Sequence, residues 1–288
     1  KYHERLDINS YLQIAKLIIN ILGSVVIVGI IINKDTTLLL SGLGVMTGFI
    51  MLTFKDTILS LVASLQISSN DLFKVGDWIE APQFGADGDV IDIALHTVKI
   101  QNWDKTLSVI PTHKLIDSTF RNWRFMSESG GRRIKRSLFI DMNSISFCSV
   151  ETLERFKKFE ILRDFIDKKQ KEVAEHNETN NIDTSEVING RRLTNIGTFR
   201  KYIEAYLRNN TNIHNEMTFL VRQLEPTETG LPIQIYVFSN DIDWIRYEEI
   251  QSDIFDHLLA VIPEFGLKIF QSPTGKDFEA LGKKTASV

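Results

Sequence analysis

Two apolar stretches joined by a short linker constrain this chain more than any other feature. Residues 11–32 and 37–54 are almost free of charged side chains. An apolar helix of about 20 residues, at about 1.5 Å per residue, crosses a hydrocarbon core of about 30 Å. A soluble protein could bury one such helix in its core, but a second one immediately after it favours a membrane. We therefore predict two membrane-spanning helices.

The second stretch carries Gly42, Gly44 and Gly48. Gly44 and Gly48 form a GxxxG pair, a spacing that lets helix backbones approach closely in lipid. The pair is weak evidence alone, because glycine is common in membrane helices. We expect these three glycines to serve helix packing.

An amphipathic segment, "KDTILSLVASLQI" (55–67), follows the second stretch without any turn residue. Its apolar residues recur at i, i+3, i+4 and i+7, which is typical of a helix with one apolar face. We expect a helix that lies along the membrane interface and is joined to the span by a charged junction at Lys55 and Asp56. A kink is expected there, within a continuous helical region over 37–69.

The rest of the chain reads as two further parts. Short strands punctuated by glycine and proline predict a small β domain, and the strands mixed with helices after it predict an α+β domain. Within the α+β domain we expect one charged helix over 151–175 and a final strand at "GLKIF" (266–270). The expected divisions are 1–70 for the membrane helices, 71–128 for the β domain, 129–273 for the α+β domain with a charged insertion at 155–196, and 274–288 for a C-terminal tail.

Several classes of function lack support in the sequence. A net charge of −4 argues against a general nucleic-acid binder, and the single cysteine, Cys148, excludes a disulfide framework and any multi-cysteine metal site. No nucleophile, phosphate-binding or histidine metal motif is present, so we expect no catalytic residue, no cofactor and no metal. Asp241 and Asp243, which precede Trp244, are interpreted as helix caps rather than as a metal loop. Cys148 is expected to be a buried, inert thiol.

Basic residues suggest the orientation in the membrane. Lys55 and Lys74 follow the second stretch closely, and the positive-inside rule then puts both ends of the chain in the cytoplasm. The basic segment 121–136 has two interpretations that the sequence leaves open. It is either a solvated linker between two subdomains or a contact for anionic lipid headgroups.

Several phrases together resemble one known family. The glycine-bearing span runs through its amphipathic continuation into "FKVGDWIE", then "GDVIDI", then "TLSVIPTHKLIDS". This combination resembles the small-conductance mechanosensitive channel (MscS) superfamily. The phrases "GADGDV", "KIQNWDKT" and "NWRFMSESGGRRIKR" are similar to its miniconductance, YbdG-type branch. The resemblance extends from residue 11 to about residue 273.

The resemblance implies an architecture and an activity. It implies a homoheptamer in the bacterial inner membrane, with the last span lining a central pore and both cytoplasmic domains forming a cage with side openings. Membrane tension would open the pore and release ions and small osmolytes in hypoosmotic shock. Membrane lipids, permeating ions and further copies of the chain are then the expected partners, and no enzyme activity is implied.

The resemblance also implies candidate gate residues. Alignment on "FKVGDWI" places Gly48 and Leu52 at the two constriction positions of the superfamily, where leucines stand, so only Leu52 matches. Val45 or Phe49 could complete the constriction. Such a gate blocks ions by dewetting.

Charge at the inner mouth is a further implication. Lys55 and Asp56 replace a glutamine and a glycine of the family pattern, and seven copies would form charged rings there.

Two other classes of function stay open. A membrane-anchored interaction protein would use the charged segment 151–175 and the polar segment 176–185 to dock partners. A secondary transporter would need broken helices and internal repeats, and neither is visible in the two apolar stretches.

Overall fold

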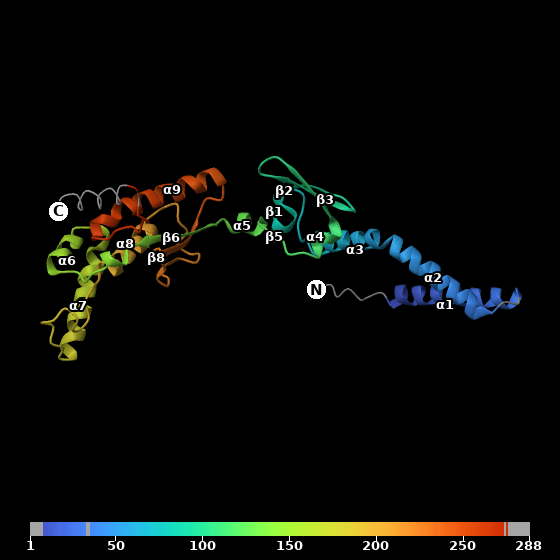
Figure 1. The fold of residues 1–288 in the computed structure, drawn as a ribbon, viewed down its shortest axis with the longest axis horizontal. Helices are drawn as coiled ribbons and strands as arrows, with labels where there is room; N and C mark the ends of the chain where they lie inside the picture. Colours follow the sequence, from blue (N-terminus) through green and yellow to red (C-terminus); the bar gives the residue numbers. More distant parts are fainter. Residues whose placement is uncertain (1–7, 33–34, 274, 276–288) are drawn as a thin grey trace. The chain divides into compact units, whose positions relative to one another are not determined.

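A computed structural model describes residues 8–32, 35–273 and 275 of the 288-residue chain (Figure 1). The chain divides into two compact units, residues 1–123 and 124–288. The predicted tail, 274–288, falls outside the described residues except at Gly275.

The first unit begins with three helices, α1 (Ile8–Ile31), α2 (Thr36–Thr53) and α3 (Lys55–Ser69). Asp35 caps α2, because its carboxylate accepts hydrogen bonds from the backbone N–H of Thr37 at 2.9 Å and from its hydroxyl at 2.6 Å. Within the described residues, α2 is the one helix long and apolar enough to cross a membrane, and the apolar part of α1 covers only Ala15–Ile31. The other predicted span, at 11–32, therefore remains a prediction.

A five-stranded antiparallel sheet with one short helix follows. The elements are β1 (Trp78–Ala81), the 3₁₀ turn η1 (Pro82–Phe84), β2 (Ala86–Ile93), β3 (Thr97–Asn102), β4 (Leu107–Pro111), α4 (Thr112–Ile116) and β5 (Arg121–Asn122). The strand order is β4-β3-β2-β1-β5. This sheet confirms the predicted β domain.

Strands β2 and β3 approach each other unusually closely at Gly88. A Cβ on this residue would overlap the carbonyl oxygen of Gln101 and would lie 2.8 Å from the Cα of Asn102. Only glycine fits there, which explains the "GDV" of β2. Residues of β2 on either side of Gly88 alternate between buried and exposed, so one face of the sheet covers an apolar core.

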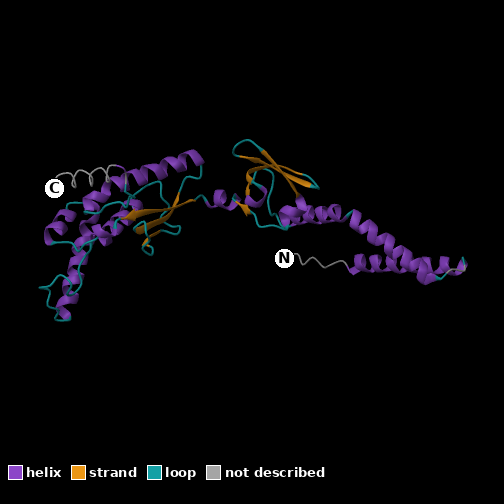
Figure 2. Cartoon of the chain, viewed as in Figure 1, coloured by secondary structure: helices purple, strands orange, loops and turns teal. Residues whose placement is uncertain are grey.

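The second unit contains a three-stranded antiparallel sheet of order β6-β8-β7, with helices α8 and α9 lying against it (Figures 1 and 2). Its elements are α5 (Arg124–Ser129), β6 (Arg132–Ile140), η2 (Met142–Ser144), α6 (Val150–Lys157), η3 (Glu160–Leu162), α7 (Arg163–Thr179), α8 (Asn195–Arg208), β7 (Leu220–Gln223), β8 (Leu231–Ser239), α9 (Trp244–Val261) and η4 (Ile262–Phe265). The predicted α+β domain is confirmed.

Two local expectations in this unit have different outcomes. Asp243 accepts the backbone N–H of Arg246 at 3.0 Å and so caps α9, as predicted. The strand expected at "GLKIF" (266–270) is wrong, because Ile269 makes only an isolated bridge to Ile140. Pairing there is confined to the end of β6, which already pairs with β8 along its length.

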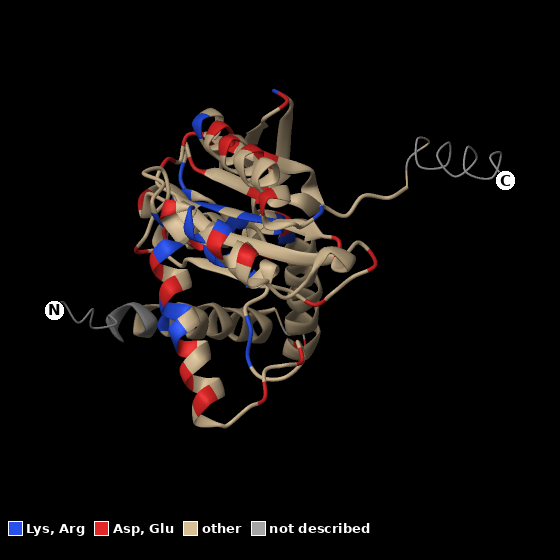
Figure 3. Cartoon of the chain, turned by 90° about the vertical axis from the view of Figure 1, so that its left-hand side faces the viewer, with Lys and Arg blue, Asp and Glu red and all other residues tan. Residues whose placement is uncertain are grey.

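The charged insertion differs from the single helix expected at its start. Helices α6 and α7 are separate, with η3 between them, and Phe156, Leu162 and Ile166 are completely buried around this turn. Burying these three apolar side chains bends the chain where charge alone predicted a continuous helix. Figure 3 shows that α7 carries both basic and acidic residues along its exposed length.

Candidate functional site

The four predicted gate candidates lie on one face of α2. Val45, Gly48, Phe49 and Leu52 fall within about 100° of the helix circumference at 3.6 residues per turn. The side chains of Val45, Phe49 and Leu52 are 76%, 71% and 76% exposed. None of the described residues covers that apolar face, as expected of a surface completed by lipid or by other copies.

The three predicted packing glycines lie on α2, and Gly42 is the one that lies beside α1. Gly42 lines a cavity of about 380 Å³ between α1 and α2, shared with Ser24 and Val28. A Cβ on any of the three glycines would meet open space among the described residues. The structure therefore brings Gly42 toward α1 and leaves the GxxxG pair without a partner helix among the described residues.

Helix direction changes at Phe54, one residue before the expected charged junction. Phe54 lies between α2 and α3 with φ −101° and ψ 8°, and Figure 1 shows the two helices running in different directions. Hydrogen bonding continues through the bend, since the N–H of Ile58 still donates to the Phe54 carbonyl at 2.9 Å. Lys55 and Asp56 form the first turn of α3 and are exposed. The helical region therefore bends at Phe54 without losing this hydrogen bond, and the charged side chains of Lys55 and Asp56 are exposed just after the bend.

The face of α3 that packs is not its predicted apolar stripe. Ile58, Leu61 and Leu65 are 48%, 47% and 59% exposed. The buried residues of this helix are instead the small Ser60 and Ala63 together with Ile67. Small side chains let α3 lie close against α4, while the apolar stripe stays available to the membrane or to other subunits.

A hydrogen bond fixes α3 to α4. Ser60 Oγ lies 3.1 Å from His113 Nδ1, and Ser60 is only 2% exposed. About two turns further along α3, Ile67 joins the core of the β domain with Phe73 and Leu115. The end of the apolar helical region is thus part of the β domain itself.

The opening of the "FKVGDWIE" phrase turns the chain from α3 into the sheet. The Asp77 carboxylate accepts the Lys74 N–H at 2.8 Å, and Gly76 adopts a φ of 94° that favours glycine. Asn122 of β5 donates to the Leu72 carbonyl at 2.9 Å and to Asp77 at 3.2 Å. The short spacer after α3 is therefore held by side-chain hydrogen bonds to an edge strand.

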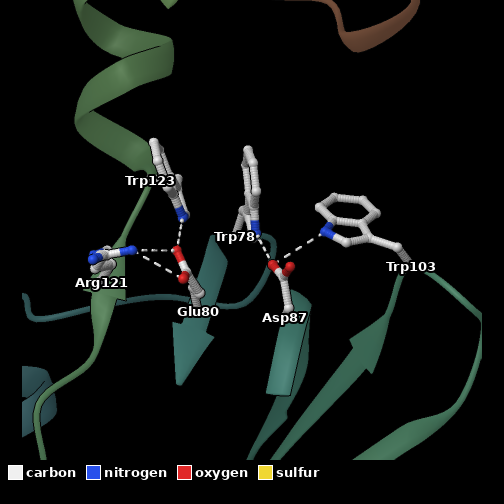
Figure 4. A network of polar contacts seen from close by, with 6 residues as sticks. All are labelled: Trp78, Glu80, Asp87, Trp103, Arg121 and Trp123. Carbon is white, nitrogen blue, oxygen red and sulfur yellow. Dashed lines mark hydrogen bonds and ion pairs between the residues drawn. The ribbon is translucent and has the colours of Figure 1, made fainter. Parts of the chain in front are cut away.

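Three tryptophans and two carboxylates form a network on the same sheet (Figure 4). The Trp78 and Trp103 indoles donate to Asp87 at 2.7 and 3.2 Å, and Trp123 donates to Glu80 at 3.2 Å. Trp78 stacks on Trp123 with ring centroids 4.8 Å apart and meets Trp103 edge-on at 5.2 Å. The network ties together β1, β2, the turn after β3 and the end of the unit.

An ion pair and a tight turn complete this network. Arg121 pairs with Glu80 at 3.0 Å. Asp104, beside Trp103, accepts hydrogen bonds from the side chain and the backbone of Thr106, which lower its pKa. Sequence reasoning missed the network and the Ser60–His113 pair, because each joins residues far apart in the chain. In the sequence, only the tryptophans beside polar residues in "WIE" (78–80) and "NWD" (102–104) hinted at side-chain hydrogen bonds.

Metal chemistry has no evident centre in the described part of the chain. No group of three or more His, Cys, Asp or Glu side chains is placed there to hold an ion.

Two family models match the chain. The β-domain model of mechanosensitive ion channels matches residues 56–125, and the C-terminal model of the mechanosensitive ion channel MscS matches residues 194–269. The first match begins inside the first turn of α3 and ends just past Trp123, so it covers the junction described above.

Curated relatives carry the same description. The chain is 30% identical over 136 residues to the small-conductance mechanosensitive channel MscMJ of Methanocaldococcus jannaschii, covering 47% of this chain and 36% of that protein. It is 20% identical over 260 residues to an uncharacterised MscS family protein of Helicobacter pylori, covering 88% of this chain and 38% of that protein. The chain thus spans less than two fifths of the length of these relatives.

Solved structures share the fold. The closed-state crystal structure of Helicobacter pylori MscS matches with a TM-score of 0.53 at 15% identity, covering 94% of this chain and 85% of that one. Wild-type MSL1 of Arabidopsis thaliana matches with a TM-score of 0.59 at 14% identity, covering 93% of this chain and 76% of that one.

Proposed function

The chain belongs to the MscS family of mechanosensitive ion channels, and from this premise we propose that it forms the pore and cytoplasmic part of a tension-gated channel. We assign it to the miniconductance, YbdG-type branch on the phrases of its β domain. Its role is to release ions and small osmolytes when hypoosmotic shock stretches the membrane.

One observation carries this proposal: an apolar helix is continued directly into the core of a rigid β domain. Force that tilts or displaces α2 acts on α3, and α3 is held by the Ser60–His113 hydrogen bond and by burial of Ile67. A simple membrane anchor needs no such connection. A gate does, because the moving helix requires a fixed support to move against.

The gate itself is the exposed apolar face of α2. With several copies arranged around an axis, Val45, Phe49 and Leu52 would face a pore that is too apolar to stay wet when narrow. Tension widens the pore, water enters, and ions follow. Gly48 occupies a constriction position but has no side chain. Leu52, with Val45 and Phe49 on the same face, would therefore form the apolar constriction that closes the pore.

Assembly and orientation follow from the same features. We propose a homoheptamer in the bacterial inner membrane, with more than one span per subunit and the α+β domain in the cytoplasm. Seven copies of Lys55 and Asp56 would then form charged rings at the inner mouth, where they bias which ions pass. Lys55 and Lys74 support the cytoplasmic placement.

A mass measurement and a flux measurement test this function together. The full-length protein, purified in detergent, is expected to have the mass of seven subunits. In liposomes it is expected to release an entrapped small ion within seconds of an osmotic downshift, and empty liposomes are the control. A monomeric or dimeric protein with no release would instead support a membrane-anchored interaction protein.

A further inference from the structure

A cavity of about 240 Å³ lies in the second unit, between α7 and the segment that leads into α8. Its walls combine a few apolar side chains with a dense set of cations. The basic residues that line it are Lys169, Arg191, Arg192, Arg200 and Lys201, and no acidic residue is among the described residues that line it. Such a lining concentrates positive potential in a recess.

Nearby carboxylates neutralise this charge only in part. Glu172 pairs with Lys169 at 2.7 Å and lies 3.9 Å from Arg191, and Glu204 pairs with Lys201 at 2.7 Å. Neither glutamate lines the cavity. Arg192 and Arg200 have no carboxylate partner among the described residues, so the cavity keeps an excess of positive charge.

Arg192 also has a hydrogen-bond donor with nothing to bind. Its Nη2 donates to the carbonyl oxygens of Thr184 at 2.6 Å and Glu186 at 3.2 Å. Its Nε is buried and has no partner among the described residues. A buried donor without an acceptor costs about 1–3 kcal/mol, more when it is charged. Arg192, which lines the cavity, thus keeps donor capacity that the described residues leave unsatisfied.

The backbone at the start of α8 is not available for this role. The N–H of Gly197 donates to Thr194 Oγ1 at 3.1 Å, and the N–H of Ile196 donates to Asn195 Oδ1 at 2.8 Å. The N–H of Thr198 donates to the Thr194 carbonyl at 3.0 Å. An anion must therefore be held by the side chains, and the helix dipole adds only a favourable potential.

We propose that this cavity binds a phosphate-class dianion, either inorganic phosphate or the terminal phosphoryl group of a metabolite. Guanidinium groups match the oxygens of phosphate in pairs, and Arg192 and Arg200 supply two of them. The volume is below the range of about 300–1,000 Å³ that is usual for whole drug-sized ligands, so it suits one compact anionic group. The site spans the charged insertion and the first two turns of α8, and it shares no residue with the gate.

Binding of inorganic phosphate to the full-length protein tests this directly. Isothermal titration at constant ionic strength, balanced with chloride, is expected to give saturable binding. Arg200→Gln and Arg192→Gln are each expected to weaken that binding at least tenfold. Lys168→Gln is the matched control, because Lys168 is an exposed cation on α7 that does not line the cavity. Arg200→Lys, which keeps the charge and loses the planar fork, is expected to fall between them.

Competition identifies the source of the anion. If ATP displaces phosphate and binds more tightly, the ligand is the phosphoryl end of a larger molecule. If phosphate binds more tightly than ATP, the ion itself is the ligand.

Three results would overturn the proposal: no saturable binding of either probe, an equal loss in Lys168→Gln and Arg200→Gln, or saturable binding of glutamate without binding of phosphate. Thermal unfolding without phosphate shows whether each variant is folded. If Arg192→Gln does not fold, the phosphate affinities of Arg200→Gln and Arg200→Lys decide whether the proposal holds. The result stands whether or not the protein conducts ions.

Discussion

Ser60 Oγ on α3 lies 3.1 Å from His113 Nδ1 on α4, and this pair joins the helical region of the membrane to the β domain. Ser60 is 2% exposed and His113 follows Thr112, which is completely buried. The contact is made where α3 presents its small side chains. Together with the burial of Ile67, it attaches α3 to the β domain, and in the proposed channel a movement of α2 would reach the sheet through these contacts.

Ser60→Ala tests this attachment. The variant removes a hydrogen bond worth about 1 kcal/mol, so amide hydrogens of α4 are expected to exchange roughly fivefold faster by local opening. Hydrogen exchange measured on the full-length protein checks it. Ser68→Ala, an exposed serine on the same helix, should leave the exchange of α4 unchanged. Equal exchange in both variants would mean that the hydrogen bond does not hold the two helices together.

Leu52→Ser tests the gate. The substitution removes about 2 kcal/mol of apolar stabilisation from each copy of the closed constriction, so the pressure threshold is expected to fall. Single-channel recording measures it. Ile50→Ser is the control, since Ile50 lies on the opposite side of α2 from the gate face. An unchanged threshold and conductance in Leu52→Ser would remove Leu52 from the constriction.

Asp87→Ala tests the tryptophan network. Two indole N–H groups, of Trp78 and Trp103, lose their acceptor; because both hydrogen bonds are exposed, water can replace it, and the cost is about 0.5–1.5 kcal/mol per bond. Three of the four tryptophans of the chain belong to the network, so a red shift of tryptophan emission is expected. Asp89→Ala, on the exposed face of β2, is the control. Identical spectra in the two variants would show that Asp87 does not order the indoles.

Cys148 gives a test that depends on pH. Burial raises the pKa of its thiol, and a hydrogen bond with Thr198 offsets part of that rise. A raised pKa favours the protonated thiol in the folded chain, so its contribution to stability is present below about pH 8.5 and is lost as the pH rises through the folded pKa. Alkylation by iodoacetamide at pH 8, located by mass spectrometry, is expected to be at least roughly tenfold slower than in the denatured chain. Equal rates would contradict a buried thiol.

Local sequence patterns predicted the elements that depend on neighbouring residues. Asp243 caps α9 because its carboxylate reaches an amide three residues ahead, a contact that any such sequence can make. The β domain follows from short alternating runs between glycines and prolines. The apolar helix α2 follows from composition alone.

Long-range contacts decided the rest. The apolar periodicity of α3 identified a helix with one apolar face for the membrane interface, but it did not indicate that the small residues Ser60 and Ala63 would be buried on another face. The tryptophan network joins residues 78, 87, 103 and 123, which no local pattern relates. The strand expected at 266–270 was wrong because β6 ends at Ile140 and the chain then turns into η2, so on the edge of β6 opposite β8 only Ile269 forms a bridge.

The gate and packing residues stay predictions for a physical reason. Val45, Phe49 and Leu52 are exposed in one chain, and their role depends on the lipid and the other copies that surround α2. The same holds for Gly44 and Gly48, whose open surroundings gain meaning only against a neighbouring helix. Lys55 and Asp56 likewise form rings only in an assembly.

The most direct test of the account is a recording from the full-length protein in excised liposome patches under graded suction. We predict discrete currents that appear above a reproducible pressure threshold and are absent from protein-free patches. Silence up to patch rupture, with intact oligomers confirmed in the same liposomes, would contradict a channel gated by tension.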